Sequence, residues 1–175
     1  SGLMSAADDF GRLYREHAPA VMSYLLYLSG STANAEELTA ETFYQAIVSA
    51  ERFRGESSLR TWLFGIARNL YLSHLRSHEQ HHAPLDEAAH VSTRDNPFTH
   101  VVQTERQRQV VAALQALSES DRSILLLYAR EGLSYQEIAY LLDLSLSAVK
   151  VRLHRARRRL SEALERLEQG ANDGL

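Results

Sequence analysis

Apolar residues recur every three or four positions along most of the chain, and no stretch alternates apolar and polar residues for long enough to make a strand. The pattern therefore predicts an all-α protein. In the first half it indicates helices over about residues 10–28, 34–51 and 59–75, the first of them kinked or interrupted at Pro19. The third helix has the most regular apolar stripe, made of Leu59, Trp62, Leu63, Ile66, Ala67, Leu70 and Leu75.

The helical pattern stops between His78 and Pro97, where polar residues and two prolines leave no apolar period. This composition predicts a flexible linker over residues 79–97. The linker joins two small helical domains, an N-terminal helical bundle over residues 5–78 and a C-terminal domain over residues 98–170. Each domain has only about 70 residues, so each has a marginal core of its own.

The C-terminal domain has the pattern of a helix-turn-helix. After helices expected over about residues 101–117 and 118–131, Ser134 and Glu137 form a capping box that opens a short helix. A turn at Asp143 then leads into a long basic helix over about residues 147–167, the layout in which the second helix enters the major groove of DNA. Its expected buried stripe is Val149, Leu153, Ala156, Leu160, Leu164 and Leu167.

Composition excludes several functional classes. The 175 residues contain no cysteine and no apolar run of the ~18 residues that a membrane span needs. The opening Ser1-Gly2-Leu3-Met4 lacks the features of a signal peptide, so we expect a cytoplasmic protein without membrane insertion of its own. The chain has no glycine-rich phosphate loop and no nucleophile motif, and we expect no catalytic residues, no cofactor and no enzymatic activity.

Charge is distributed unevenly. The net charge is −3, yet residues 145–160 contain six basic residues and no acidic one. Arginine and lysine can contact guanine or clamp phosphate, so this basic helix is a candidate for DNA recognition. A basic helix end in solvent is the simpler alternative. The basic residues are Lys150, Arg152, Arg155, Arg157, Arg158 and Arg159.

The third helix combines cations with aromatic rings. Basic side chains beside stackable rings are typical of single-stranded DNA binding, because every base offers a face on which an aromatic ring can stack. For Trp62 alone, a place in the core is the better interpretation. The candidate set is Arg60, Thr61, Trp62, Arg68, Asn69, Tyr71 and Arg76.

Four ordered segments resemble bacterial RNA polymerase sigma factors of the extracytoplasmic-function (ECF, group IV) type. They are NAEELTAETFYQAI at 34–47, SLRTWLFGIARN at 58–69, LSYQEIA at 133–139 and VKVRLHRARRRL at 149–160. The resemblance implies two helical domains, one for the −10 promoter element and one for the −35 element. It implies an alternative sigma factor that binds core polymerase and directs promoter-specific initiation.

The resemblance also assigns residues to partners. It implies that core polymerase, through its β′ clamp helices with further contacts to the β subunit, binds Glu37, Leu38, Glu41, Thr42 and Phe43. It implies that the third-helix set named above binds the −10 element, with a base unstacked into a small pocket. It further implies a membrane-bound anti-sigma factor that covers apolar surfaces of both domains. The residues expected to bind the −35 element are Ser147, Lys150, Arg152, His154, Arg155 and Arg158.

The sequence departs from the family pattern at the helix-turn-helix. Asp143 stands where the family usually has glycine, at a position that often needs a left-handed backbone. Ala148 and Val151 replace the commoner threonine and serine, which leaves the preferred −35 sequence open.

Two alternatives are weighed against the sigma-factor hypothesis. A self-sufficient helix-turn-helix regulator would bind its operator without polymerase, but it offers no reason for the glutamate-rich second helix. The cluster His74, His78, His81 and His82 has spacing compatible with a divalent metal. A polar helix end that runs into the linker is the simpler interpretation, and we expect no metal site.

Overall fold

The computed structural model describes residues 6–81 and 104–174, and within these ranges the chain forms helices and no strand. The predicted all-α class is therefore confirmed. Before the gap lie α1 (Ala6–Ser29), α2 (Thr32–Val48), the 3₁₀ turn η1 (Ala50–Arg52) and α3 (Leu59–His81). After it lie α4 (Glu105–Gln115), α5 (Glu119–Leu125), the π-helical turn η5 (Leu126–Arg130), α6 (Tyr135–Leu142) and α7 (Leu146–Asp173).

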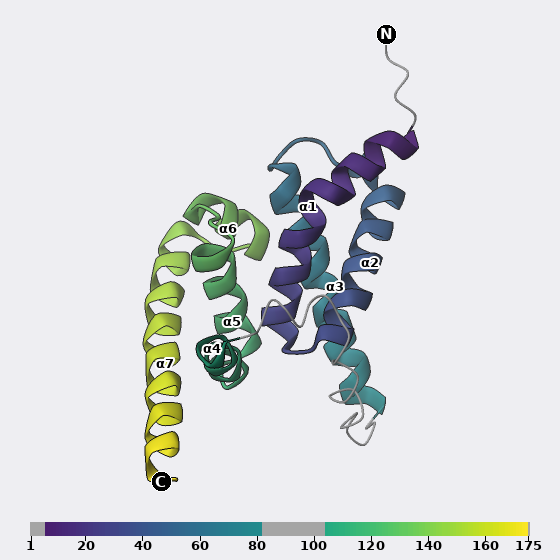
Figure 1. Cartoon of the computed structure of the whole chain (residues 1–175). Helices are drawn as coiled ribbons and strands as arrows, with labels where there is room; N and C mark the ends of the chain where they lie inside the picture. Colours follow the sequence, from purple (N-terminus) through teal and green to yellow (C-terminus); the bar gives the residue numbers. More distant parts are fainter. Residues whose placement is uncertain (1–5, 82–103, 175) are drawn as a thin grey trace.

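The three N-terminal helices form a bundle in which α1 packs against both α2 and α3 (Figure 1). Pro19 lies inside α1, and the helix continues through it with a bend. Gly30 then takes a φ of 69° and ends the helix, and the Ser31 side chain caps α2 by accepting a hydrogen bond from the Asn34 amide.

In the described part of the C-terminal domain, each of the four α-helices begins with a hydroxyl cap, whereas η5 has none. Thr104, Ser118, Ser134 and Ser145 each accept a hydrogen bond from the amide three residues on. The predicted capping box of Ser134 and Glu137 is present. Asp143 adopts φ 54° and ψ 53°, so the turn does need the left-handed conformation that the sequence suggested. This turn sets α6 and α7 in the helix-turn-helix arrangement.

Several predicted boundaries differ from the structure. α2 ends at Val48 and gives way to η1, so residues 49–51 are not α-helical. α3 runs to His81, so the first three residues of the expected linker are helical, while residues 82–97 lie outside the described part. α7 continues to Asp173, and its buried stripe includes Ala163 while Leu167 is 38% exposed.

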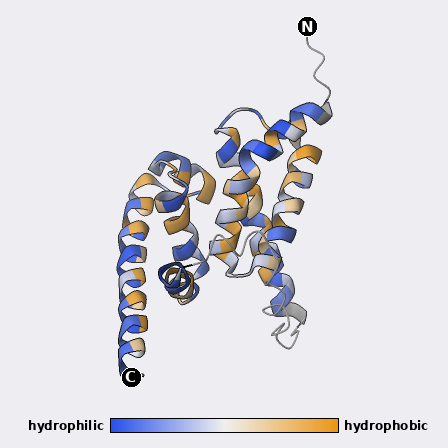
Figure 2. Ribbon diagram, in the orientation of Figure 1, coloured by the Kyte–Doolittle hydropathy of each residue, from blue (hydrophilic) through white to orange (hydrophobic). Residues whose placement is uncertain are grey.

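The two domains share one hydrophobic core. Tyr24 and Phe64 of the N-terminal helices belong to the same buried cluster as Ile124 and Leu127 of the C-terminal helices. Each small domain thereby buries apolar surface that it could not cover alone. Figure 2 shows α7 hydrophilic along its outer edge and hydrophobic toward α4 and α5. Among the described residues, no helix is long and apolar enough to cross a membrane.

Candidate nucleic-acid interface

The basic helix α7 presents a continuous polar face. Val149, Leu153 and Ala156 are buried and fix the orientation of the helix. None of the basic side chains on the opposite face pairs with a carboxylate in the described part of the chain, so all are available to an anion. The six residues expected at the −35 element are all exposed: Ser147, Lys150, Arg152, His154, Arg155 and Arg158.

Two other arginines of α7 are engaged within the protein. Arg159 donates to Oδ2 of Asp121 on α5 at 2.6 Å. The guanidinium carbon of Arg157 lies 5.0 Å from the centroid of the Tyr128 ring, in cation–π geometry. The basic residues of α7 thus form two groups. Arg157 and Arg159 contact η5 and α5, whereas the others lie on the open face of the helix.

The candidate −10 residues of α3 lie mostly against the C-terminal domain. Arg60 pairs with Glu131 at 3.3 Å, and the Thr61 hydroxyl group donates to Glu137 at 2.7 Å. Arg68 donates to Ser123 at 3.2 Å and pairs with Glu119 at 3.3 Å. Thr61 is only 1% exposed. The C-terminal domain therefore contacts three of the seven candidate residues in this structure, and of these Thr61 is buried while the Arg60 side chain remains 41% exposed.

Tyr71 is also covered, because it belongs to the core between the domains. It is 4% exposed, and its hydroxyl group accepts a hydrogen bond from Arg122 at 3.1 Å. Burial raises its pKa above the usual value. The Tyr71 side chain is therefore not accessible to DNA while the domains are packed together, and its contact with the −10 element stays a prediction.

Arg122 is a buried link between the domains that the sequence analysis missed. It is 7% exposed and donates to the carbonyl oxygens of Leu28, Leu114 and Leu117. A buried guanidinium is stable only where its donors are satisfied, and here backbone carbonyls from both domains do this. An isolated arginine within an otherwise ordinary helical pattern gave no signal of this role.

Two glutamates at the interface have opposite pKa shifts. Burial raises the pKa of Glu131, and one of its carboxylate oxygens is buried without a hydrogen-bond partner. The hydrogen bond from Thr61 lowers the pKa of Glu137 by stabilising its ionised form. The interface therefore contains one carboxyl group that favours protonation and one that resists it.

Trp62, which is half-buried, borders a small polar cavity. Trp62 packs against Phe53 with ring centroids 5.0 Å apart, and Tyr140 of α6 donates to Glu56 at 3.2 Å. The sequence analysis passed over residues 52–57, whose aromatic and charged side chains become a site only when the loop folds back on Trp62. The cavity, of about 100 Å³, is lined by Arg52, Phe53, Arg54, Glu56, Ser57, Trp62 and Tyr140. Asn69 and Arg76 are exposed further along α3.

On α2, the expected polymerase-binding residues divide into two faces. Glu37 and Glu41 are exposed, whereas Leu38, Thr42 and Phe43 are at most 3% exposed and belong to the bundle core. In this packing these three side chains support the bundle, and direct contact between them and a partner stays a prediction. The helical period places other side chains beside the glutamates, and Tyr44, Ile47 and Val48 are at least half exposed.

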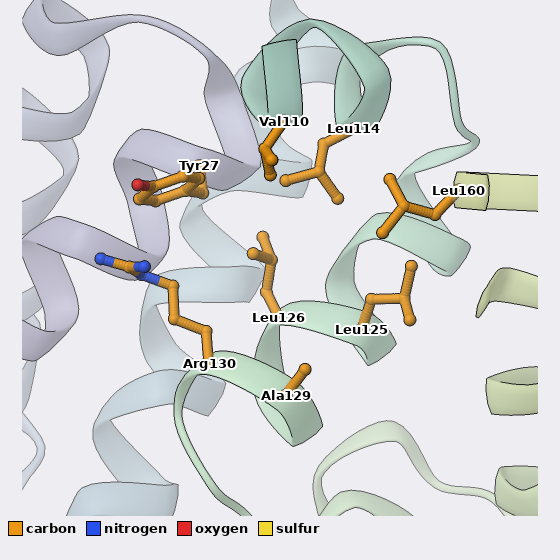
Figure 3. Close-up of a pocket in the computed structure, with 8 residues that line it drawn as sticks. All are labelled: Tyr27, Val110, Leu114, Leu125, Leu126, Ala129, Arg130 and Leu160. Atoms are coloured by element: carbon orange, nitrogen blue, oxygen red, sulfur yellow. The ribbon is translucent and has the colours of Figure 1, made fainter. Parts of the chain in front are cut away.

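An apolar cavity of about 360 Å³ lies where both domains meet, and Figure 3 shows the side chains that line it. Tyr27 comes from α1, and the Arg130 guanidinium lies 4.0 Å from its ring centroid. Both domains must be packed together for this cavity to exist. The remaining lining residues are Val110, Leu114, Leu125, Leu126, Ala129 and Leu160.

The histidine cluster is only partly described. The rings of His74 and His78 lie 4.6 Å apart between centroids. The side chain of His81 and all of His82 lie outside the described part. Within that part, no group of three or more metal-binding side chains occurs.

Comparison with known proteins identifies the two domains. Sigma-70 region 2 matches residues 13–81, and sigma-70 region 4 matches residues 107–160. The RNA polymerase sigma factor YlaC of Bacillus subtilis is 32% identical over 91% of this chain and 94% of its own length. The ECF RNA polymerase sigma factor EcfG of Rhodopseudomonas palustris is 31% identical over 83% of this chain and 80% of its own.

The fold likeness extends across both domains. The sigma factor RpoE of Bartonella quintana, solved in complex with the anti-sigma factor NepR, superposes with a TM-score of 0.73 and 29% identity, covering 90% of this chain and 97% of RpoE. With region 2 and region 4 in the family's order and relatives that align along most of the chain, this protein belongs to the sigma-70 family as an RNA polymerase sigma factor of the ECF type.

Proposed function

We propose that this chain binds core RNA polymerase through the exposed face of α2, defined by Glu37, Glu41, Tyr44, Ile47 and Val48. Acidic and apolar side chains suit a protein partner, and the acidic ones would repel DNA. This face is held in position by the buried side chains of Leu38, Thr42 and Phe43, which pack α2 against the bundle. The role is not catalytic, and it belongs in the cytoplasm because polymerase and chromosome are there.

The C-terminal domain reads the −35 element with the exposed face of α7. Arginine and lysine on this face supply phosphate and guanine contacts, while buried Val149 and Leu153 set the angle of the helix. Because Arg157 and Arg159 contact η5 and α5, the surface that can bind DNA is limited to the side of α7 that faces away from α5.

The N-terminal domain holds the −10 element with α3 and the neighbouring loop. We assign the unstacked base of the non-template strand to the cavity that Phe53 and Trp62 help to line, which offers aromatic side chains and polar partners for a base edge. Tyr140 of the other domain lies at this cavity in the packed arrangement, so the base enters after the domains separate.

This base-pocket assignment can be tested with 2-aminopurine placed singly at each −10 position of the non-template strand. With the assembled polymerase, one position should change its fluorescence strongly as its base leaves the stack. Phe53→Ala and Trp62→Ala should each abolish that change, while Tyr140→Ala should preserve it. An unaltered signal in both ring variants would remove the cavity from the −10 site.

The observation that carries the choice of function is the covering of Arg60, Thr61 and Arg68 by the C-terminal domain. A self-sufficient regulator gains nothing from covering its own DNA-binding residues. A sigma factor does, because core polymerase then becomes the condition for DNA binding. Gel-shift titration of promoter fragments should therefore show specific complexes with chain and core polymerase together, and specific binding by the chain alone would favour the regulator.

We further propose that an anti-sigma factor, itself membrane-bound, inserts an apolar side chain into the cavity around Tyr27, Leu126 and Leu160. RpoE was solved in complex with the anti-sigma factor NepR. A second solved structure, CnrH with the cytosolic domain of CnrY, is 26% identical to this chain and superposes with a TM-score of 0.65. Because both domains line the cavity, an occupant would hold them together. Leu126→Glu should then abolish capture by the anti-sigma factor.

A further inference from the structure

Val151 is an exposed apolar side chain on the polar face of α7. It is 49% exposed, and its neighbours on that face one turn away are Ser147 and Arg155. A β-branched residue in an exposed helix is less favourable than alanine. The packing of the described chain thus gives no reason for valine at this position.

Val151 lies in a hollow with mixed chemistry. The hollow has a volume of about 360 Å³, and Val151 and Ala148 supply its apolar surface. Two serines and two arginines supply hydroxyl and guanidinium groups to the same lining. Its other lining residues are Ser145, Ser147, Arg152 and Arg155.

The chemistry of the major groove restricts what an apolar side chain there can recognise. Guanine, adenine and cytosine present only hydrogen-bonding groups, whereas thymine also presents its C5-methyl group. A valine cannot hydrogen-bond, so the selective contact open to it is this methyl group. Arg155 lies four residues further along, about 6 Å at 1.5 Å per residue, which corresponds to roughly two base pairs.

We propose that Val151 is a specificity-determining residue that recognises the methyl group of a thymine in the −35 element. The thymine lies within about two base pairs of the base or phosphate bound by Arg155. This inference rests on the proposed function of α7 as the −35 reader, and it adds to that function the identity of one base.

The test begins with selection of bound sequences by the assembled polymerase from duplexes randomised across the −35 region. Each thymine of the selected element is then replaced singly by deoxyuridine, which lacks only the C5-methyl group. One replacement should weaken binding about fourfold, the loss of one buried methyl contact. Val151→Ser should weaken binding to the thymine-containing site by a similar factor and should be insensitive to that replacement.

Leu167→Ser is the matched control, because it also removes an exposed apolar side chain but lies sixteen residues further along α7. It should retain the deoxyuridine effect. If every replacement affects the native chain and Val151→Ser equally, or if the selected element has no thymine, the inference is overturned. Unchanged −35 preference with weaker assembly of Val151→Ser on polymerase would also overturn it, in favour of a protein contact.

The failure of the underlying function would look different. Selection that enriches no −35 sequence at all would remove α7 as the reader and would leave no site for Val151 to recognise. Enrichment of an element whose thymine methyl groups are irrelevant would retain α7 as the reader and reject only the role of Val151.

Discussion

The Nη2 atom of Arg60 lies 3.3 Å from Oε2 of Glu131, 71 residues away in the sequence and in the other domain. A cation expected to contact promoter DNA is thus paired with a carboxylate of the same chain. With the Thr61–Glu137 and Arg68–Glu119 contacts, this pair forms the polar edge of a shared core. Under the proposed function, these contacts are replaced by contacts with DNA when the promoter binds.

Neutralising the covering carboxylates should make the −10 surface more accessible. The free chain of the double variant Glu119→Gln and Glu131→Gln should bind a single-stranded −10 oligonucleotide about fivefold more tightly than the native chain. This factor corresponds to roughly 0.5 kcal/mol for each of the two ion pairs that no longer has to be broken. Fluorescence anisotropy measures this. Glu168→Gln, whose carboxylate pairs with Arg106 at 3.5 Å, is the control. Equal affinities of double variant and control would contradict the covering role.

The two interface glutamates should titrate on opposite sides of the ordinary value of 4.5. Burial raises the pKa of Glu131, so the packed chain binds a proton there more tightly than the unfolded chain does. The contribution of Glu131 to stability is therefore fully present below pH 4.5 and is lost as the pH rises through the raised pKa. The Thr61 hydrogen bond lowers the pKa of Glu137, so its contribution is present above pH 4.5 and is lost as the pH falls through the lowered pKa.

Carboxyl ¹³C NMR can follow both glutamates in one titration. Thr61→Val should raise the midpoint of Glu137 by removing the hydrogen-bond donor and should leave that of Glu131 above 4.5. Coincident midpoints in the native chain would mean that the domains do not pack in this way.

Two adjacent residues of α2 should have different roles: Phe43 should contribute to the stability of the fold, and Tyr44 to polymerase binding. Phe43 is 1% exposed and its ring lies edge-on to Tyr14, so Phe43→Ala should destabilise the fold by about 3–5 kcal/mol. Tyr44 is 63% exposed, so Tyr44→Ala should change stability by no more than about 0.5 kcal/mol. Tyr44→Ala should still weaken core polymerase binding about tenfold, as an aromatic anchor does. Urea unfolding and polymerase titration measure the two effects, and native-like polymerase affinity of Tyr44→Ala would exclude this face.

Two arginines of α7 provide a matched pair for promoter reading. Arg155→Ala should cost about 1–3 kcal/mol of discrimination at the −35 element, because its exposed guanidinium is free to bind a base edge. Arg157→Ala should leave discrimination unchanged, because that side chain lies over Tyr128. Binding to native and mutated −35 duplexes by the assembled polymerase measures both, and an equal loss in the two variants would show that the open face is misassigned.

Local features of the fold could be predicted from the sequence because they depend on neighbouring residues. The Ser134–Glu137 capping box and the buried Val149, Leu153 and Ala156 follow from side-chain chemistry within one or two turns. The left-handed backbone at Asp143 was suggested by the resemblance, because the family usually has glycine at that position. The exposed −35 set follows from the buried residues, because a helix whose buried stripe is known has a known open face.

The contacts between domains could not be predicted, because they join residues far apart in the sequence. Nothing near Arg122 indicates that it will bind the Leu28 carbonyl, and nothing near Thr61 indicates Glu137. The burial of Phe43 could not be predicted from the motif for a related reason: a motif indicates which helix meets a partner, while packing decides which face of that helix remains exposed.

The most direct test of the central claim is co-elution of this chain with core RNA polymerase on a sizing column, followed by run-off transcription from a pooled genomic template. We predict stoichiometric co-elution and new transcripts that begin at defined sites and share −10 and −35 elements. Elution of the chain apart from polymerase, with specific binding to duplex DNA unaided, would contradict the account and identify a stand-alone regulator.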